Sequence, residues 1–204
     1  MSEVIVKKTA GWQVLTYLTF LFLMILIPTY LHYYGPQNFL WLSDMGLFLT
    51  CLALWLNKPV LMSMAAVGVL VLELIWCFDF FAELLFNINP IDLSDYMFNA
   101  SLPILLRAIS LFHVATPIIW VRYLWQFGYD KRALNYFIAL YWVVLMLTYQ
   151  LTDPVENINW VFMPKVVNMG AITPVAWLLI MIIGFPLLLF WPTHLCYKKF
   201  FKIR

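Results

Sequence analysis

Five titratable side chains lie within otherwise apolar stretches of this sequence, and they are its most informative residues. The segment 105–121, "LLRAISLFHVATPIIWV", contains Arg107 and His113. The other three are acidic: Asp44, Glu73 and Asp79. Ionisable residues are costly in hydrocarbon, face the protein interior when they occur there, and mark functional sites by default. We therefore expect these residues to form a buried polar site.

Estimated depths place three of these residues at one level of the membrane. With a rise of about 1.5 Å per helical residue, Asp44 and Glu73 lie about 9 Å from the external face and Arg107 about 8 Å. Because an arginine keeps its proton, Arg107 needs a carboxylate partner, which Asp44 or Glu73 could supply. Asp79 completes the substrate-binding or ion-pair candidates, although its position also fits a solvated interfacial residue. Alternatively, the trio is a structural clamp that joins three helices.

His113 is expected near the middle of the membrane, six residues deeper than Arg107. Ser110 precedes it by three residues, on a related face of the helix. Pro117 follows it by four residues and removes the hydrogen bond that would run to the His113 carbonyl. A free carbonyl and a bend beside a histidine suit a small polar cavity. The alternative is that His113 only binds a neighbouring backbone group.

Serine and histidine together suggest nucleophilic chemistry, since histidine can take the proton of an attacking hydroxyl. We predict that Ser43 is the nucleophile, with Ser110 as the alternative, and that His113 is the general base. Asp44 would orient or tune the pair, and Arg107 would bind a carboxylate or phosphate headgroup. This interpretation describes a serine-type hydrolase or acyltransferase that acts on a lipid within the bilayer.

The same residues admit two other interpretations. A proton-linked transporter or permease for a small anion or lipid would use the buried charges as proton and substrate sites. With 204 residues and no internal repeat, it would need to form a homo-oligomer. A non-catalytic assembly subunit would use the charges only to fix helix packing. Because carboxyls outnumber the one permanent cation, we expect a protonated carboxyl or a charged His113.

The rest of the chain supplies the helices that position these residues. Of 204 residues, 65% are hydrophobic and 11% are charged, whereas soluble domains are about a quarter charged. Segments of about 20 apolar residues span a bilayer, and six are expected to do so: 12–34, 38–56, 59–86, 102–125, 133–151 and 173–195. Backbone amides in lipid need internal partners, and these runs do not alternate. We predict an all-α polytopic membrane protein with six transmembrane helices in a single domain, 1–204.

Basic residues indicate the orientation of this bundle, because they concentrate in cytoplasmic loops. Lys58, Lys131 and Arg132 lie in alternate connections, and further basic residues flank both termini: Lys7, Lys8, Lys198, Lys199, Lys202 and Arg204. We therefore predict that the N- and C-termini are cytoplasmic. The charge asymmetry and the lack of an evident import signal favour a bacterial inner membrane.

The longest connection, 152–172, contains the apolar stretch "NWVFMP", which predicts a lid or re-entrant segment over the external face. The sequence has no nucleophile-elbow, nucleotide-loop, zinc or paired-cysteine motif. We expect no cofactor or metal and no nucleic-acid partner, and membrane lipids as the partners. The sequon at Asn99 lies too close to a predicted span to carry weight.

The stretches "FLWLSDMGLFLT" and "SLFHVATP" resemble the androgen-induced family of six-helix intramembrane fatty-acid-ester hydrolases. The resemblance covers the second to fourth predicted helices. It implies ester hydrolysis by a threonine near the start of an early span and a histidine on a later one. His113 matches the histidine, whereas Trp41 stands at the threonine position and Ser43 lies two residues further on.

Overall fold

The computed structural model describes residues 9–162 and 172–204, and its regular elements are helical, as predicted. Four short helices, η1, η2, η3 and η4, cover Pro36–Leu40, Asp95–Met97, Ile158–Trp160 and Pro186–Phe190. The α-helices are α1 (Ala10–Tyr33), α2 (Leu42–Leu56), α3 (Pro59–Phe86), α4 (Ile104–Ile109), α5 (Phe112–Phe127), α6 (Ala133–Leu151), α7 (Pro174–Phe185) and α8 (Trp191–Phe200).

Within the described residues, five helical segments are long and apolar enough to cross a membrane: Ala10–Tyr33, Pro59–Phe86, Ile104–Phe127, Ala133–Leu151 and Pro174–Phe200. The chain is therefore a multi-pass helical membrane protein. The segment predicted at 38–56 differs, because its first residues form the 3-10 turn η1. The remaining helix, α2, has 15 residues, which corresponds to a length of about 22 Å. A sixth crossing and the single domain stay predictions.

The fourth predicted span is interrupted rather than continuous. α4 ends at Ile109 and α5 begins at Phe112. Between them the Ser110 N–H donates to the Arg107 carbonyl in a tight turn. The Ser110 hydroxyl donates to the Leu106 carbonyl oxygen at 3.2 Å. A serine that binds a carbonyl of the preceding turn competes with regular helical bonding.

Pro117 lies inside α5, and the helix continues past it. The break in the helix lies before His113, between Ile109 and Phe112. As expected from the missing proline N–H, the His113 carbonyl can accept another donor. The Cys77 thiol of α3 takes this role, with Sγ 3.4 Å from the carbonyl oxygen. The bond fixes the start of α5 against the middle of α3.

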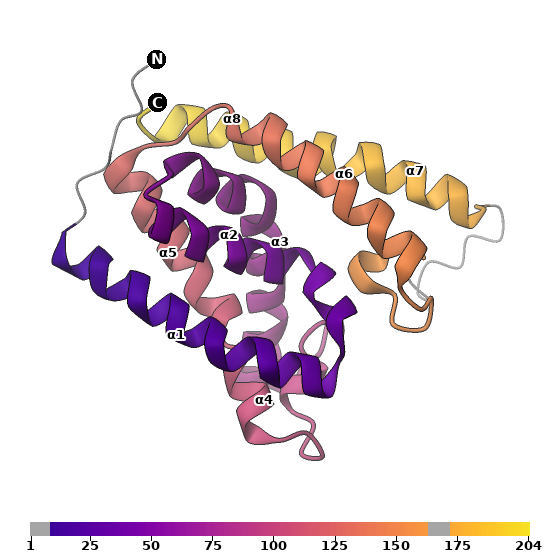
Figure 1. Cartoon of the computed structure of the whole chain (residues 1–204). Coiled ribbons are helices and arrows are strands. Elements are labelled where there is room, and N and C mark those ends of the chain that lie inside the picture. Colours follow the sequence, from indigo (N-terminus) through magenta and orange to yellow (C-terminus); the bar gives the residue numbers. More distant parts are fainter. Residues whose placement is uncertain (1–8, 163–171) are drawn as a thin grey trace.

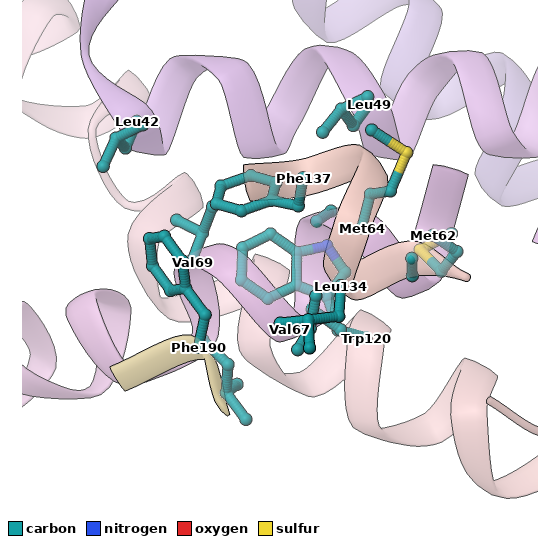
Figure 2. Packing of buried hydrophobic residues seen from close by; sticks show 14 of the residues in the cluster. Leu42, Leu49, Met62, Met64, Val67, Val69, Trp120, Leu134, Phe137 and Phe190 are labelled. Carbon is teal, nitrogen blue, oxygen red and sulfur yellow. The ribbon is translucent and has the colours of Figure 1, made fainter. Parts of the chain in front are cut away.

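The helix α3 forms the centre of the bundle and packs against α2, α5 and α6 (Figure 1). Small residues permit this close packing. Gly46 lies against the Trp120 ring, and a methyl group at Gly68 would overlap the Phe137 ring. Figure 2 shows Trp120 and Phe137 among the aliphatic side chains of this core. The packing holds α2, α3 and α5 in a fixed relation, on which the site depends.

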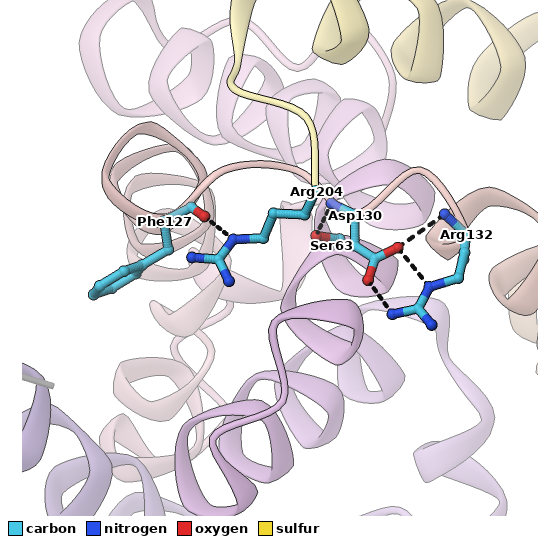
Figure 3. Close-up of polar contacts among 5 residues, drawn as sticks. All are labelled: Ser63, Phe127, Asp130, Arg132 and Arg204. Atoms are coloured by element: carbon cyan, nitrogen blue, oxygen red, sulfur yellow. Dashed lines mark hydrogen bonds and ion pairs between the residues drawn. The ribbon is translucent and has the colours of Figure 1, made fainter. Parts of the chain in front are cut away.

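Polar contacts close the end of the bundle where α3 begins and α5 ends (Figure 3). The Asp130 carboxylate accepts hydrogen bonds from the Arg132 guanidinium at 2.7 and 3.0 Å, and the Asp130 N–H donates to the Ser63 hydroxyl. Burial acts to raise the pKa of Asp130, but the bonds from Arg132 outweigh it and hold that pKa below its usual value. The Arg204 guanidinium donates to the Phe127 carbonyl. The basic residues of the C-terminus therefore gather at this end.

Candidate functional site

A cavity of about 420 Å³ lies at the opposite end of the bundle. The end of α1, the start of α2, the second half of α3 and the start of α5 surround it. Its lining includes five predicted site residues: Ser43, Asp44, Glu73, Ser110 and His113. Residues far apart in the sequence therefore meet around one space, on the side away from the basic C-terminus.

The His113 imidazole is held on three sides. Its Nδ1 lies 2.5 Å from Oε2 of Glu73, whose side chain is 1% exposed. The ring stacks between Trp76 and Phe112, at centroid distances of 4.4 and 4.2 Å and interplanar angles of 17° and 23°. No described residue hydrogen-bonds Nε2. The pair therefore fixes one ring nitrogen and leaves the other for a molecule in the cavity.

The carboxylate that contacts His113 is therefore Glu73, not Asp44 as expected. Asp44 is 2% exposed, and its Oδ2 accepts a hydrogen bond of 3.3 Å from the Asn38 amide. Within the described part of the chain, Oδ1 of Asp44 and Oε1 of Glu73 are buried without a hydrogen-bond partner. Such atoms lose their hydration without compensation, so they mark where a ligand could donate.

The two candidate nucleophiles differ in their surroundings. The Ser110 hydroxyl lies 3.0 Å from the Tyr30 hydroxyl and also bonds the Leu106 carbonyl, which occupies it. Ser43 is the second residue of α2 and is partly exposed where it lines the cavity. Of the two, Ser43 is placed better to attack a bound molecule.

The first turn of α2 also offers backbone donors beside Ser43. The Leu42 N–H donates to Oδ1 of Asn159, and the Met45 N–H donates to the Trp41 carbonyl. The N–H groups of Ser43 and Asp44 lie between them, where a helix has no intrahelical acceptors for its first amides. Amides at a helix N-terminus favour a negatively charged oxygen.

Arg107 and Asp79 lie outside this cavity, in contrast to the prediction. The break after Ile109 separates Arg107 from the helix that bears His113, and its Nη1 donates to the Met97 carbonyl at 3.2 Å. Its Nε has no hydrogen-bond partner among the described residues, none of which forms an ion pair with it. The predicted pairs of Arg107 with Asp44 and Glu73, and hence the clamp, are wrong.

Asp79 has a role in shaping the loop after α3. It is fully buried. Its carboxylate accepts hydrogen bonds from the backbone N–H groups of Ile91, Leu93 and Ser94, at 2.8–2.9 Å, and from the Ser94 hydroxyl. The expectation of a solvated interfacial residue is therefore wrong. Because Leu93 and Asp92 line the cavity, Asp79 supports one of its walls.

The described part of the predicted lid, 152–162, contributes Asn159 and Trp160 to the cavity wall. Both residues have positive φ, 53° and 57°, a conformation that costs about 1–3 kcal/mol per residue and is typical of functional sites. The Asn159 amide donates to the Leu40 carbonyl, and its oxygen accepts from Leu42. The remainder of the lid prediction falls on 163–171, outside the described residues.

Two residues of the site, Tyr30 and Asn159, were not assigned a role from the sequence. Tyr30 at the end of α1 holds Ser110, and Asn159 fixes the start of α2. Trp76, which follows Glu73 by three residues on the same helical face, was expected to complete the hydrogen bonding of the Arg107 partners, and in the structure its ring stacks on His113. Asn159 lies within "NINWVF", a pattern that indicates a role in the site less clearly than the spacing of Glu73 and Trp76 does.

The described lining contains three carboxyl side chains, Asp44, Glu73 and Asp92, and one histidine, but no lysine or arginine. The cavity is therefore negative whenever these carboxyls are ionised and His113 is neutral. Among the residues that the structure describes, no three histidine, cysteine or acidic side chains converge as metal ligands would.

Comparison of the chain with protein-family models, with curated proteins and with solved structures found no match. The cavity and its chemistry are therefore the basis for a functional proposal.

Proposed function

We propose that this protein is an intramembrane acyl-ester hydrolase or acyltransferase that uses Ser43 as nucleophile. The observation that carries the proposal is the Glu73–His113 contact beside a cavity that Ser43 also lines. A base oriented by a third group, in a cavity that a serine also lines, provides the groups that nucleophilic acyl transfer uses. Glu73 replaces Asp44 as the orienting carboxylate.

Each group has a separate role in the proposed reaction. The Ser43 oxygen attacks the ester carbonyl carbon while Nε2 of His113 takes the hydroxyl proton. The amides of Ser43 and Asp44 stabilise the oxyanion. When the C–O bond breaks, the leaving alkoxide receives that proton, and Ser43 keeps the acyl group. A water or a second lipid hydroxyl, deprotonated by His113, then takes the acyl group and restores the serine.

The surroundings favour a lipid as the acyl donor. The cavity is formed by helices whose outer surfaces are apolar, and fatty esters dissolve in the same phase. The likeness of "FLWLSDMGLFLT" and "SLFHVATP" to the androgen-induced hydrolases extends to His113, whereas Trp41 stands at the nucleophile position of that family. In this proposal a substrate would reach Ser43 without leaving the bilayer.

Hydrolysis of p-nitrophenyl decanoate by the purified protein in a neutral detergent tests this proposal. We expect Ser43→Ala and His113→Ala to lower kcat/KM at least about 100-fold, and Ser110→Ala to keep most of the activity. Equal activity of wild type and folded Ser43→Ala would overturn the assignment of the nucleophile. Absence of hydrolysis with this ester and with decanoyl glycerides would overturn the enzyme proposal.

A second candidate, a proton-linked transporter, draws support from the two unpartnered carboxylate oxygens of Asp44 and Glu73. Buried carboxyls of this kind are typical of proton relays in membranes. A transporter needs no nucleophile, so Ser43→Ala would retain activity and Glu73→Gln would lose it. Proteoliposomes with an internal pH dye and an imposed choline gradient provide the measurement. Acidification that survives in Ser43→Ala favours transport over hydrolysis.

A further inference from the structure

Two buried carboxylate oxygens in the cavity have no hydrogen-bond partner among the described residues. They are Oδ1 of Asp44 and Oε1 of Glu73, whose side chains are 2% and 1% exposed. Both residues line the cavity, and its described lining contains no lysine or arginine. A positive group in this space would offset the negative charge of these buried carboxylates.

Aromatic rings supply the rest of the lining near Asp44. Trp41 and Trp160 meet edge to face at 6.0 Å, and Tyr30 and Tyr34 do so at 5.5 Å. All four rings line the cavity. The faces of Trp76 and Phe112 are already used by His113, so these two pairs remain available. Carboxylates combined with aromatic faces are the environment that organic ammonium ions prefer.

We propose that this cavity binds an alkylammonium group, and that the ester substrate carries one in its polar head. The second part rests on the proposed hydrolase function, whereas the first does not. A small hydrated metal cation would gain little from the aromatic faces, whereas an alkylammonium uses both features. An anionic headgroup would meet Asp44 and Glu73 without a compensating cation.

The geometry also assigns different tasks to the two carboxylates. Oε2 of Glu73 is used by His113, so Glu73 has only Oε1 to offer. Asp44 shares Oδ2 with the Asn38 amide, and its Oδ1 has no hydrogen-bond partner among the described residues. Asp44 adjoins Ser43 in the sequence, so an ammonium held by Asp44 would place the rest of the ligand beside the nucleophile. We therefore assign the headgroup contact to Asp44.

Binding of a matched pair of esters tests this proposal. Decanoylcholine and its uncharged isostere 3,3-dimethylbutyl decanoate have the same shape and differ only in the charge of the head. Ser43→Ala is used to prevent turnover, and the fluorescence of the cavity tryptophans reports binding. We expect decanoylcholine to bind at least about 10-fold more tightly than the isostere, in the range of measured cation–π and ionic contributions. Equal affinities would overturn the proposal.

Two variants test which carboxylate is responsible for the preference for the charged ester. Asp44→Asn, in the same Ser43→Ala background, should remove the preference for the charged ester, whereas Glu83→Gln on α3 should keep it. A preference that survives Asp44→Asn would overturn the assignment to this carboxylate. If Asp44→Asn does not fold, competition by tetramethylammonium against decanoylcholine in the Ser43→Ala protein tests the ammonium site itself. We expect competition, and none would contradict an ammonium site.

The affinity for choline alone tests whether the site binds the head of a lipid or a free cation. We expect choline to bind more weakly than decanoylcholine by at least about 10-fold, and equal affinities would overturn the headgroup part. The wild-type protein separates this inference from the hydrolase proposal. Selective binding without hydrolysis of either ester would overturn the hydrolase and keep the ammonium site. Hydrolysis of both esters with equal kcat/KM would overturn the ammonium site and keep the hydrolase.

Discussion

At the scale of single residues, the position of the His113 imidazole follows from three contacts. Glu73 binds Nδ1, and the stacked rings of Trp76 and Phe112 leave little freedom of rotation. A carboxylate on Nδ1 favours the tautomer whose Nε2 accepts a proton, and it stabilises the imidazolium that forms. The orienting carboxylate is therefore as important to the proposed chemistry as the base.

Glu73→Gln tests this dependence. The amide keeps the size of the side chain but removes the charge, so His113 loses its preferred tautomer. We expect kcat for p-nitrophenyl decanoate to fall by about 100- to 10,000-fold, with an unchanged thermal midpoint within a few degrees. Glu83→Gln, on the same helix, is the control and should keep wild-type activity. A Glu73→Gln protein with full activity would exclude Glu73 from the mechanism.

At the scale of elements, the close packing of α3 on α2 and α6 determines where Glu73 lies relative to the other helices. Gly68 allows the Phe137 ring to lie directly on the α3 backbone. Interiors of this density tolerate added methyl groups poorly. The same packing sets the relative positions of Asp44 on α2 and Glu73 on α3, which both line the cavity.

We expect Gly68→Ala to lower the free energy of unfolding by about 1–3 kcal/mol, because the new methyl overlaps the Phe137 ring. Gly184→Ala in α7 is the matched control, since nothing lies within 4 Å of its added Cβ. The control should be neutral or slightly stabilising. Thermal unfolding in detergent, followed by circular dichroism, provides the comparison. Equal midpoints for the two variants would contradict the packing described here.

The break between α4 and α5 explains which parts of the site followed from the sequence. The apolar segments and the set Ser43, Asp44, Glu73, Ser110 and His113 could be identified from composition and spacing. The pairing of these residues could not be predicted, because the depths of Arg107 and His113 were counted along one continuous helix. The turn at Ser110 removes Arg107 from that helix and directs it to the loop at Met97. No proline or glycine marks this turn, and Pro117 lies within the continuous helix α5, so the turn could not be predicted.

At the scale of the whole molecule, the two ends of the bundle have different chemistry. One end gathers basic residues around Asp130 and the C-terminus, and the other contains the acidic, aromatic cavity. The charge pattern predicted this asymmetry. Which end faces the cytoplasm stays a prediction, since the bundle itself does not distinguish the two sides of a membrane.

Labelling of single cysteines tests the orientation. With the three native cysteines replaced, Val155→Cys lies on the cavity side and Lys131→Cys on the basic side; both positions are exposed. A membrane-impermeant maleimide should label Val155→Cys in intact cells and Lys131→Cys only after lysis. The opposite pattern would show that the termini are external.

The Asp130–Arg132 contact predicts a pH dependence of stability. The pKa of Asp130 is lower in the folded than in the unfolded protein, so its contribution is present above the unfolded pKa of about 3.9 and is lost as the pH falls through the folded value. Asp130→Asn should lower the thermal midpoint at about pH 7, and its difference from the wild type should shrink as the pH falls below about 3.9. The exposed Asp95→Asn is the control. A constant difference at every pH would contradict this linkage.

The most direct test of the central claim is to locate the adduct of a fluorophosphonate on the protein in neutral detergent. Mass spectrometry of the labelled protein identifies the modified residue. The account predicts a phosphonyl group on Ser43, strongly reduced in His113→Ala and in Glu73→Gln, and unchanged in Ser110→Ala. A folded protein that is labelled at another residue, or not labelled at all, would contradict Ser43 as an activated nucleophile.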